Sequence, residues 1–198
     1  HCALLCQKQH QQHQQQRHSR KLNKYLANLA VSDLFIGVLC VPFAYWNLML
    51  GEWIFSNWLC PATQFVLLSS VFVTSATLTV IGIERFVVTF FVFSPAHFWF
   101  KVKSTKIIAL IWLAGFVYAA IPLKHTHVVQ VQARIEDGQS LVYQCKYDNN
   151  PGLIKKQAFM LTNLIVTFVI PAVVLTLCYC AIIRKLVRII GRKAIHSV

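Results

Sequence analysis

The amino-acid sequence predicts an all-α membrane protein with four membrane-spanning helices. Of its 198 residues, 57% are hydrophobic and only 13% are charged, and the mean hydropathy is +0.56. This composition is too apolar for a soluble domain. Because a helix of about 20 apolar residues crosses a bilayer, stretches without charge locate the spans. Those stretches are 34–51, 53–83, 107–123 and 157–183.

The uncharged stretches define helices near 24–48, 57–91, 104–123 and 154–188. The first helix extends back beyond Asp33 because residues 25–32 also carry no charge. A soluble bundle of four buried helices is the alternative. It is disfavoured because the helices have too few polar faces to cover a core.

Lys and Arg residues concentrate on one side of the predicted membrane. Thirteen of them precede the first helix, lie near the connection between the second and third, or lie at the end of the fourth. The opposite side holds five, together with four acidic residues. Because basic segments stay in the cytoplasm, we expect a multi-pass protein of the plasma membrane with both termini and the 92–103 loop inside. The net charge of +13 then indicates contact with membrane lipid. Nucleic-acid binding would need a folded basic surface, which is not visible.

The chain divides into three parts. Residues 1–22 form a cytoplasmic segment with an inner loop, residues 23–190 hold the membrane helices, and residues 191–198 begin the next inner loop. Residues 7–18 are rich in Gln and His, and we expect this low-complexity stretch to be disordered. The chain does not begin with Met and stops in a basic run after Gly191, which favours a fragment.

The outer connection between the third and fourth helices is predicted to form a β-hairpin. Two alternating stretches, 129–132 and 141–145, flank Asp137-Gly138, a pattern typical of a hairpin turn. Of the seven cysteines, Cys60 and Cys145 fall on the outer, oxidising side. We therefore expect a disulfide between them. The cysteines within the spans are interpreted as small apolar residues, and no spacing indicates a metal site.

Several motifs resemble rhodopsin-like (class A) G-protein-coupled receptors in their order and spacing. In chain order, the matching residues are Asn28 to Leu34 with Pro42 for the second helix, Trp53 for the first outer loop, Cys60 and Glu84-Arg85-Phe86 for the third helix, Trp112 and Pro122 for the fourth, Cys145 for the second outer loop, and Pro171 with Tyr179 for the fifth. The resemblance covers roughly residues 19–193. It implies a partial seven-transmembrane helix bundle, helices two to five, with a β-hairpin outer loop.

The resemblance assigns roles to polar residues inside the membrane. Asp33 lies near mid-membrane, where an isolated carboxylate needs a cation, a proton or hydrogen bonds. In the family this acid binds Na⁺, an allosteric ion, together with a polar residue of helix three, here Thr74. No other cofactor is expected. Asn28 and Trp112 are placed to hydrogen-bond across helices, which is most simply read as helix-to-helix attachment.

The resemblance also assigns a switch to the cytoplasmic end of the second span. Glu84 is expected to hold Arg85 in the inactive state, with Phe86 completing the motif. On activation, Arg85 moves toward a heterotrimeric G protein and toward the Tyr179 hydroxyl. The alternative is an anchoring charge at the membrane surface.

Pro171 removes a backbone hydrogen bond within the fourth span and favours a bulge there. The chain departs from the family pattern at two positions. Ser75 stands where a bulky aliphatic residue usually faces Pro171, which puts the usual packing switch in doubt. Val92 stands where the inner loop commonly has a proline, so we expect a remodelled inner loop.

The ligand class follows from the expected pocket. Leu67 stands where amine receptors of the family carry an Asp, so a cationic amine would lack its counter-ion. Tyr147 and Asp148 follow the disulfide and are candidates to cover the entrance. The hairpin, the Glu-Arg-Phe variant and a neutral pocket favour a neuropeptide over a lipid or other small ligand. Residues expected to face the pocket at helical spacing are Gln64, Leu67, Leu68, Val71, Met160, Asn163 and Thr167.

We therefore predict a receptor, and not an enzyme, that couples an extracellular ligand to a G protein through a two-state helix packing. A channel or transporter would show several polar residues along one stripe, whereas Asp33 stands nearly alone. A non-signalling truncated isoform is a further alternative. Helices one, six and seven of the family are not in these 198 residues, which we do not expect to signal alone.

Overall fold

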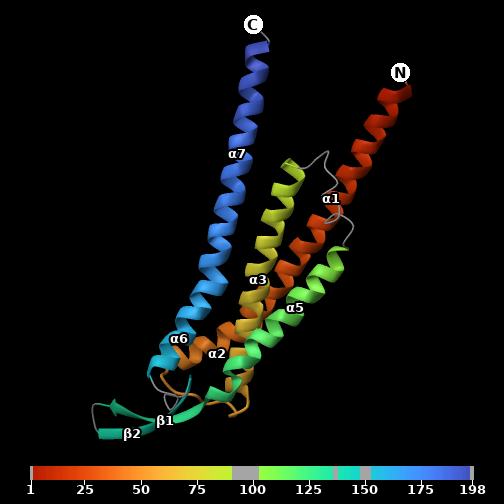
Figure 1. The fold of residues 1–198 in the computed structure, drawn as a ribbon. Helices are drawn as coiled ribbons and strands as arrows, with labels where there is room; N and C mark the ends of the chain where they lie inside the picture. Colours follow the sequence, from red (N-terminus) through yellow and green to blue (C-terminus); the bar gives the residue numbers. More distant parts are fainter. Residues whose placement is uncertain (1, 91–102, 136–137, 148–152, 197–198) are drawn as a thin grey trace.

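The computed structural model describes residues 2–90, 103–135, 138–147 and 153–196. Long helical segments run beside one another, with both termini at one end and a β-hairpin at the other (Figure 1). The segments long and apolar enough to cross a membrane are Ser19–Met49, Leu59–Phe90, Ser104–Leu123 and Gln157–Arg192. They confirm the four predicted spans and the all-α membrane class.

The first helical segment is longer than its predicted span. α1 (Cys2–Phe35) continues through a π-helical turn, η1 (Ile36–Cys40), into α2 (Val41–Met49). The expected disorder of residues 7–18 is wrong, because this stretch belongs to α1. Gln, Lys and Arg are good helix formers, and neither Gly nor Pro occurs before Gly37, so nothing ends the helix.

α3 (Leu59–Phe90) is the central helix and packs against α1, α5 and α7. α5 (Ser104–Ala120) passes into a 3₁₀ turn, η3 (Ile121–His125). Gly115 lets α5 approach α3 closely, because a Cβ at this position would lie 3.2 Å from Val73 Cγ2 and 3.3 Å from the Ser69 carbonyl oxygen.

The last helical segment also contains a π-helical turn. It consists of α6 (Leu153–Leu164), η4 (Ile165–Val169) and α7 (Ile170–His196). A proline follows each π-helical turn: Pro42 follows η1, and Pro171 follows η4. Proline lacks an N–H, and its ring clashes with the carbonyl four residues earlier, which a wider turn relieves. The bulge expected at Pro171 takes the form of η4.

The predicted hairpin is confirmed. β1 (Thr126–Ile135) and β2 (Gly138–Tyr147) pair antiparallel, with Val128 opposite Cys145. Residues 136–137 at the turn lie outside the described part of the chain. The backbone N–H of Trp53 donates to the Tyr143 carbonyl at 2.6 Å, which attaches the connection before α3 to the edge of β2.

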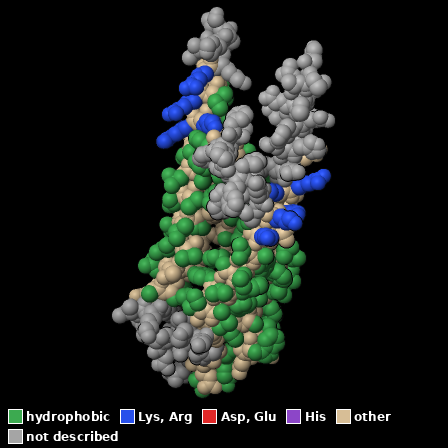
Figure 2. Space-filling model, turned by 45° about the vertical axis from the view of Figure 1, so that its right-hand side comes forward, with side chains coloured by type: hydrophobic (Ala, Val, Ile, Leu, Met, Phe, Trp, Pro, Cys, Tyr) green, Lys and Arg blue, Asp and Glu red, His purple; other side chains and the backbone are tan. Residues whose placement is uncertain are grey.

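Small and polar side chains, and not large apolar ones, occupy the helix interfaces. Leucines such as Leu34, Leu113 and Leu177 are more than 60% exposed. On the face shown in Figure 2, hydrophobic side chains form a band, and Lys and Arg lie beyond it toward the termini. This pattern is typical of helices that pack within lipid, where small residues allow close contact. The largest fully buried side chains are those of Tyr25, Val73, Thr77, Cys60, Ser32 and Ser70.

Candidate functional site

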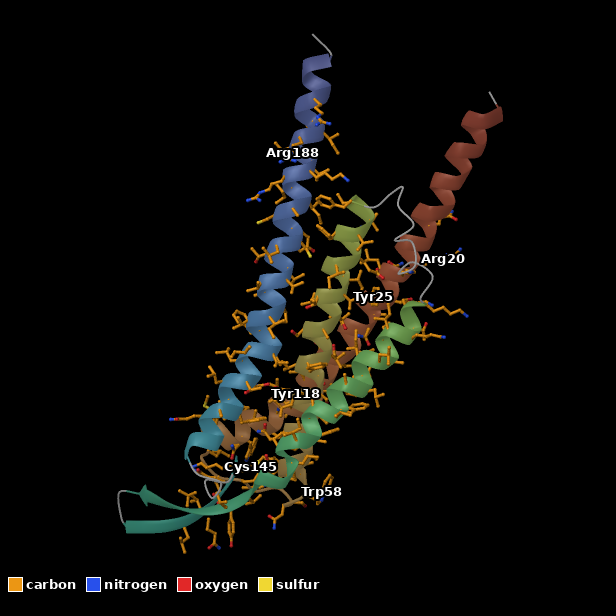
Figure 3. The ribbon with its side chains drawn as sticks, in the orientation of Figure 1. Arg20, Tyr25, Trp58, Tyr118, Cys145 and Arg188 are labelled. Carbon is orange, nitrogen blue, oxygen red and sulfur yellow. A yellow bond between two sulfur atoms is a disulfide. The ribbon has the colours of Figure 1, made fainter. Side chains whose placement is uncertain are left out.

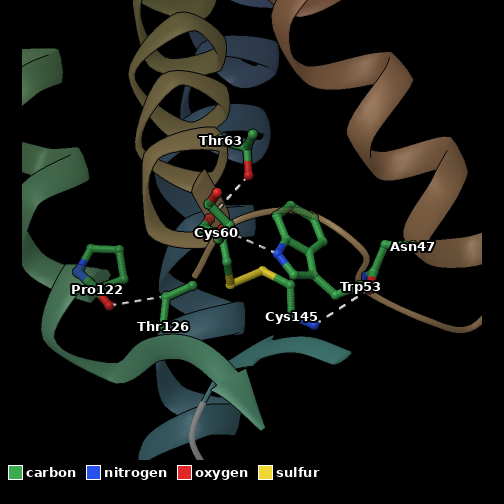
Figure 4. Close-up of a disulfide and its surroundings, with 8 residues drawn as sticks. Asn47, Trp53, Cys60, Thr63, Pro122, Thr126 and Cys145 are labelled. Atoms are coloured by element: carbon green, nitrogen blue, oxygen red, sulfur yellow. Dashed lines mark hydrogen bonds between the residues drawn. A yellow bond between two sulfur atoms is a disulfide. The ribbon is translucent and has the colours of Figure 1, made fainter. Parts of the chain in front are cut away.

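A disulfide fixes the hairpin over the outer end of α3 (Figure 4). The Cys60 and Cys145 sulfur atoms are 2.00 Å apart, which confirms the predicted pair. Trp53 is 5% exposed and packs in the same apolar cluster as both cysteines, and its Nε1–H donates to the Ser56 carbonyl at 3.3 Å. The Asn47 Oδ1 atom accepts the Cys145 backbone N–H at 3.4 Å. The disulfide thus joins α3 to β2, and the Asn47 hydrogen bond attaches α2 to the same outer layer.

The residues predicted to face a ligand lie on two helical segments, next to this layer and toward the middle of the bundle. On α3, Gln64, Leu67, Leu68 and Val71 are half-buried. On the last helical segment, Asn163 and Thr167 are half-buried, whereas Met160 is 52% exposed. The Tyr147 side chain and Asp148 lie outside the described residues.

Tyr118 contacts one of these predicted ligand-facing residues, and the sequence reasoning missed it. Its hydroxyl donates to Asn163 Oδ1 at 3.0 Å and its ring stacks on Phe72 at 5.3 Å between centroids. Thr167 Oγ1 in turn donates to the Asn163 carbonyl at 2.7 Å. Both polar candidates of this segment therefore have a hydrogen bond within the protein, and these bonds orient the two side chains.

Asp33 and Thr74, the predicted ion-site residues, are neighbours across the α1–α3 interface. Thr74 Oγ1 donates to Asp33 Oδ1 at 3.4 Å. Ser32 adds a third oxygen, because its Oγ lies 2.9 Å from Thr74 Oγ1 and is fully buried. A carboxylate and two hydroxyl groups are oxygen donors that suit a hard cation such as Na⁺. Sequence reasoning missed Ser32, although its place beside Asp33 is a signal.

Asn28 joins three helices at mid-bundle. Its Nδ2 donates to Thr77 Oγ1 at 2.9 Å, and its Oδ1 accepts from Trp112 Nε1 at 2.8 Å. The structure therefore brings Asn28 and Trp112 together in the way that their positions suggested, and it adds Thr77. This network attaches both α1 and α5 to α3.

At the end of α3 that lies toward the chain termini, Glu84 is bonded to a residue that the sequence reasoning did not consider. The Tyr25 hydroxyl donates to Glu84 Oε1 at 3.1 Å, and the Tyr25 side chain is fully buried. Tyr25 and Tyr118 lie toward opposite ends of the bundle (Figure 3). Tyr25 stands three residues before Asn28 and seven before Ser32, so the helical period places it on the same face.

The structure does not bring Arg85 to either of its expected partners. Glu84 and Arg85 are both described and half-buried, and no ion pair joins them. Tyr179 is 47% exposed on α7, and no hydrogen bond joins its hydroxyl to Arg85 in the described chain. Phe86 stacks on Phe90 with ring centroids 4.6 Å apart.

Lys185 of α7 contacts the last turn of α3 at the same end of the bundle. Its Nζ donates to the Thr89 carbonyl in the last turn of α3 and lies 4.7 Å from the centroid of the Phe90 ring. Thr89 Oγ1 also donates to the Arg85 carbonyl at 2.8 Å. A cation at a helix C-terminus satisfies free carbonyls and interacts well with the helix dipole. Sequence reasoning missed this contact, because 96 residues separate the two partners.

Comparison with known proteins adds evidence about the chain as a whole. Residues 10–196 match the family model described as "7 transmembrane receptor (rhodopsin family)". The chain is 27% identical to the QRFP-like peptide receptor of Branchiostoma floridae over 83% of this chain and 43% of that protein. It is 28% identical to neuropeptide receptor 22 of Caenorhabditis elegans, over 79% of this chain and 36% of that receptor.

A similar match extends to a human protein. The chain is 28% identical to the KiSS-1 receptor of Homo sapiens over 87% of this chain and 41% of that receptor. The chain therefore spans well under half the length of these curated relatives.

Proposed function

We propose that this chain, which belongs to the rhodopsin family of seven-transmembrane receptors, forms helices two to five of a neuropeptide receptor that activates a heterotrimeric G protein. The observation that carries the proposal is the make-up of α3. Its outer end is tied to the hairpin through Cys60, its middle carries Thr74 beside Asp33, and its inner end carries Arg85. One helix thus connects an outer surface to a cytoplasmic one.

A peptide is the ligand class that best fits the outer surface. Two of the relatives reported above are named as peptide receptors. Leu67 supplies no carboxylate for an amine, and the exposed Leu141 and Tyr143 of β2 offer apolar contacts to a chain. A lipid or another small ligand is the second candidate, supported by the neutral side chains of the α3 face.

The G protein is proposed to bind at the cytoplasmic end of α3. The Tyr25 hydroxyl donates to Glu84 Oε1, and no ion pair joins Glu84 to Arg85 in the described chain, which leaves the Arg85 guanidinium available to the G protein. We place this end and both termini in the cytoplasm, because basic residues favour that side of the plasma membrane and anionic lipid.

An allosteric Na⁺ is proposed at Asp33, with Thr74 and Ser32 as the further oxygen donors. When bound, the ion supplies the positive charge that a carboxylate in a membrane needs. The hydrogen bond between Ser32 and Thr74 orients the two hydroxyl oxygens beside Asp33.

The test uses the full-length protein that contains this chain, expressed in cells with a reporter of G-protein activation. We expect at least one member of a neuropeptide library to activate it. Arg85→Ala should keep labelled-peptide binding and lose nucleotide exchange, whereas Arg20→Ala, which removes an exposed charge from α1, should keep both. Activation by lipids and by no peptide would establish the second candidate, and normal exchange in Arg85→Ala would overturn the role of Arg85.

A further inference from the structure

The backbone around Pro171 lacks one hydrogen-bond donor. In an α-helix, the N–H of each residue bonds to the carbonyl four residues earlier. Pro171 has no N–H, so the Thr167 carbonyl, which lies within the π-helical turn η4, cannot receive the α-helical bond and keeps only the π-type donor five residues on, the Ala172 N–H. Inside a membrane, the loss of a donor to a backbone carbonyl is costly because lipid offers none.

A side chain from another helix supplies the donor at this carbonyl. Ser75 Oγ on α3 donates to the Thr167 backbone oxygen at 2.6 Å. Ser75 is half-buried, and an aliphatic side chain at this position could pack against the segment but could not donate. The serine at position 75, where the family usually has an aliphatic residue, therefore gives the Thr167 carbonyl a hydrogen bond at the place where Pro171 supplies none.

The other proline of the fold gives an internal comparison. Pro42 follows η1 just as Pro171 follows η4, and the carbonyl four residues before Pro42 belongs to Val38. Val38 is 59% exposed, and among the side-chain hydrogen bonds of the described residues none reaches its carbonyl. A proline after a π-helical turn thus does not by itself recruit a donor from a second helix.

Two further contacts between α3 and the last helical segment lie beyond Ser75, toward the end of the bundle that holds the termini (Figure 1), and both are made by α7. A Cβ at Gly82 would overlap Leu175 Cδ2, so α7 touches the α3 backbone there. The Thr89 carbonyl accepts from Lys185. Positions 75, 82 and 89 are spaced by seven residues, which is two helical turns, so they lie along one face of α3. We call these three contacts the α3–α7 seam.

We propose that Ser75 is a positioning residue that holds the α6–η4–α7 segment in its resting place by donating the hydrogen bond that Pro171 cannot. The hydroxyl reaches the Thr167 carbonyl only when the segment lies against α3. Movement of the segment away from α3 breaks this bond, and loss of the hydroxyl shifts the equilibrium toward the moved state.

The first measurement is thermal unfolding of the full-length protein, which does not depend on the proposed receptor function. Ser75→Thr keeps a hydroxyl. Ser75→Val introduces a side chain of the same shape as threonine but without the hydroxyl. We expect Ser75→Val to lower Tm by about 2–4 °C relative to Ser75→Thr. Ser69→Ala is the matched control, because among the described residues the Ser69 hydroxyl bonds only to the Val66 carbonyl of its own helix.

A Pro171→Ala background tests the mechanism. The alanine adds a backbone N–H four residues after Thr167, which can compete for its carbonyl, so the difference between Ser75→Thr and Ser75→Val should become smaller. An equal difference in both backgrounds would overturn the proposal. If the Pro171→Ala protein does not fold, the Thr and Val variants decide alone, and equal Tm values for these two would overturn it.

A second measurement separates positioning from simple stabilisation, and it rests on the proposed function. We expect Ser75→Val to raise ligand-independent nucleotide exchange about threefold over Ser75→Thr, the ratio that an average hydrogen bond between membrane helices represents. Unchanged basal exchange together with a lowered Tm would overturn the positioning role. A protein that activates no G protein under any ligand would refute the proposed function, while the Tm comparison would still test the hydrogen bond.

Discussion

Replacement of Asn28 by Ala is expected to loosen the attachment of α1 and α5 to α3. Asn28 is 8% exposed, so water cannot readily replace its partners. The change removes the donor to Thr77 Oγ1 at 2.9 Å and the acceptor for Trp112 Nε1 at 2.8 Å. Thr77 keeps its bond to the Val73 carbonyl, so the Trp112 N–H is the group left without a partner.

The expected magnitude follows from these two bonds. Hydrogen bonds between membrane helices average about 0.6 kcal/mol and reach about 1.7 kcal/mol. Loss of both should lower the free energy of unfolding by about 1–3 kcal/mol. Trp112→Phe removes only the bond to Asn28 and keeps an aromatic ring against Phe35, whose centroid lies 6.0 Å from that of Trp112. Its cost should therefore be about half as large.

A double-mutant cycle in detergent, followed by denaturant titration, isolates the bond between Asn28 and Trp112. We expect a coupling energy of about 0.6 kcal/mol. Asn57→Ala is the control, because Asn57 is exposed in the connection before α3. If the two single costs simply add in the double variant, the bond contributes nothing and the reasoning fails.

Three more predictions concern the two ends of α3 and its seam with α7. Cys60→Ala should abolish surface expression or ligand binding of the full-length protein, because the hairpin loses its anchor to α3; normal binding would contradict this. Tyr25→Phe removes the buried donor to Glu84 and should lower the free energy of unfolding by about 1–3 kcal/mol, with Tyr45→Phe at an exposed position as the control. Gly82→Ala should lower Tm because the added methyl overlaps Leu175, and Leu175→Ala should restore part of the loss; no restoration would show that the two residues do not meet.

The membrane spans and the hairpin could be predicted because their signals are local. Uncharged stretches of sufficient length locate the helices, and two alternating stretches around Asp137-Gly138 locate the strands. The pairing of Cys60 with Cys145 followed from sidedness, because the basic segments left only these two cysteines outside. Each inference needed composition or short spacing, and not knowledge of how helices pack.

The contacts within the site could not be predicted in the same way. Tyr25 and Glu84 are 59 residues apart and Ser75 and Thr167 are 92 apart, so no local pattern names the partner. The disorder expected for residues 7–18 failed for another reason. The polar composition of residues 7–18 shows only that they cannot form a buried core. They can still be helical, because they continue a helix that is already formed at residues 19–35 and contain no helix-breaking residue.

The distribution of these polar contacts divides the bundle into a fixed part and a movable part. In lipid, helices gain no hydrophobic energy by meeting, so hydrogen bonds and close packing decide their positions. Asn28 of α1 is buried and bonds both to Thr77 of α3 and to Trp112 of α5. The last helical segment meets α3 through the seam, where single contacts are spread over positions 75, 82 and 89 and a π-helical turn interrupts the helix. It also meets α5 through the single hydrogen bond between Tyr118 and Asn163. A displacement can break such contacts one at a time, whereas α1 and α5 cannot move without breaking a shared network. Motion between the hairpin end and the end that holds the termini is therefore expected to be movement of the α6–η4–α7 segment against a stationary α1–α3–α5 unit.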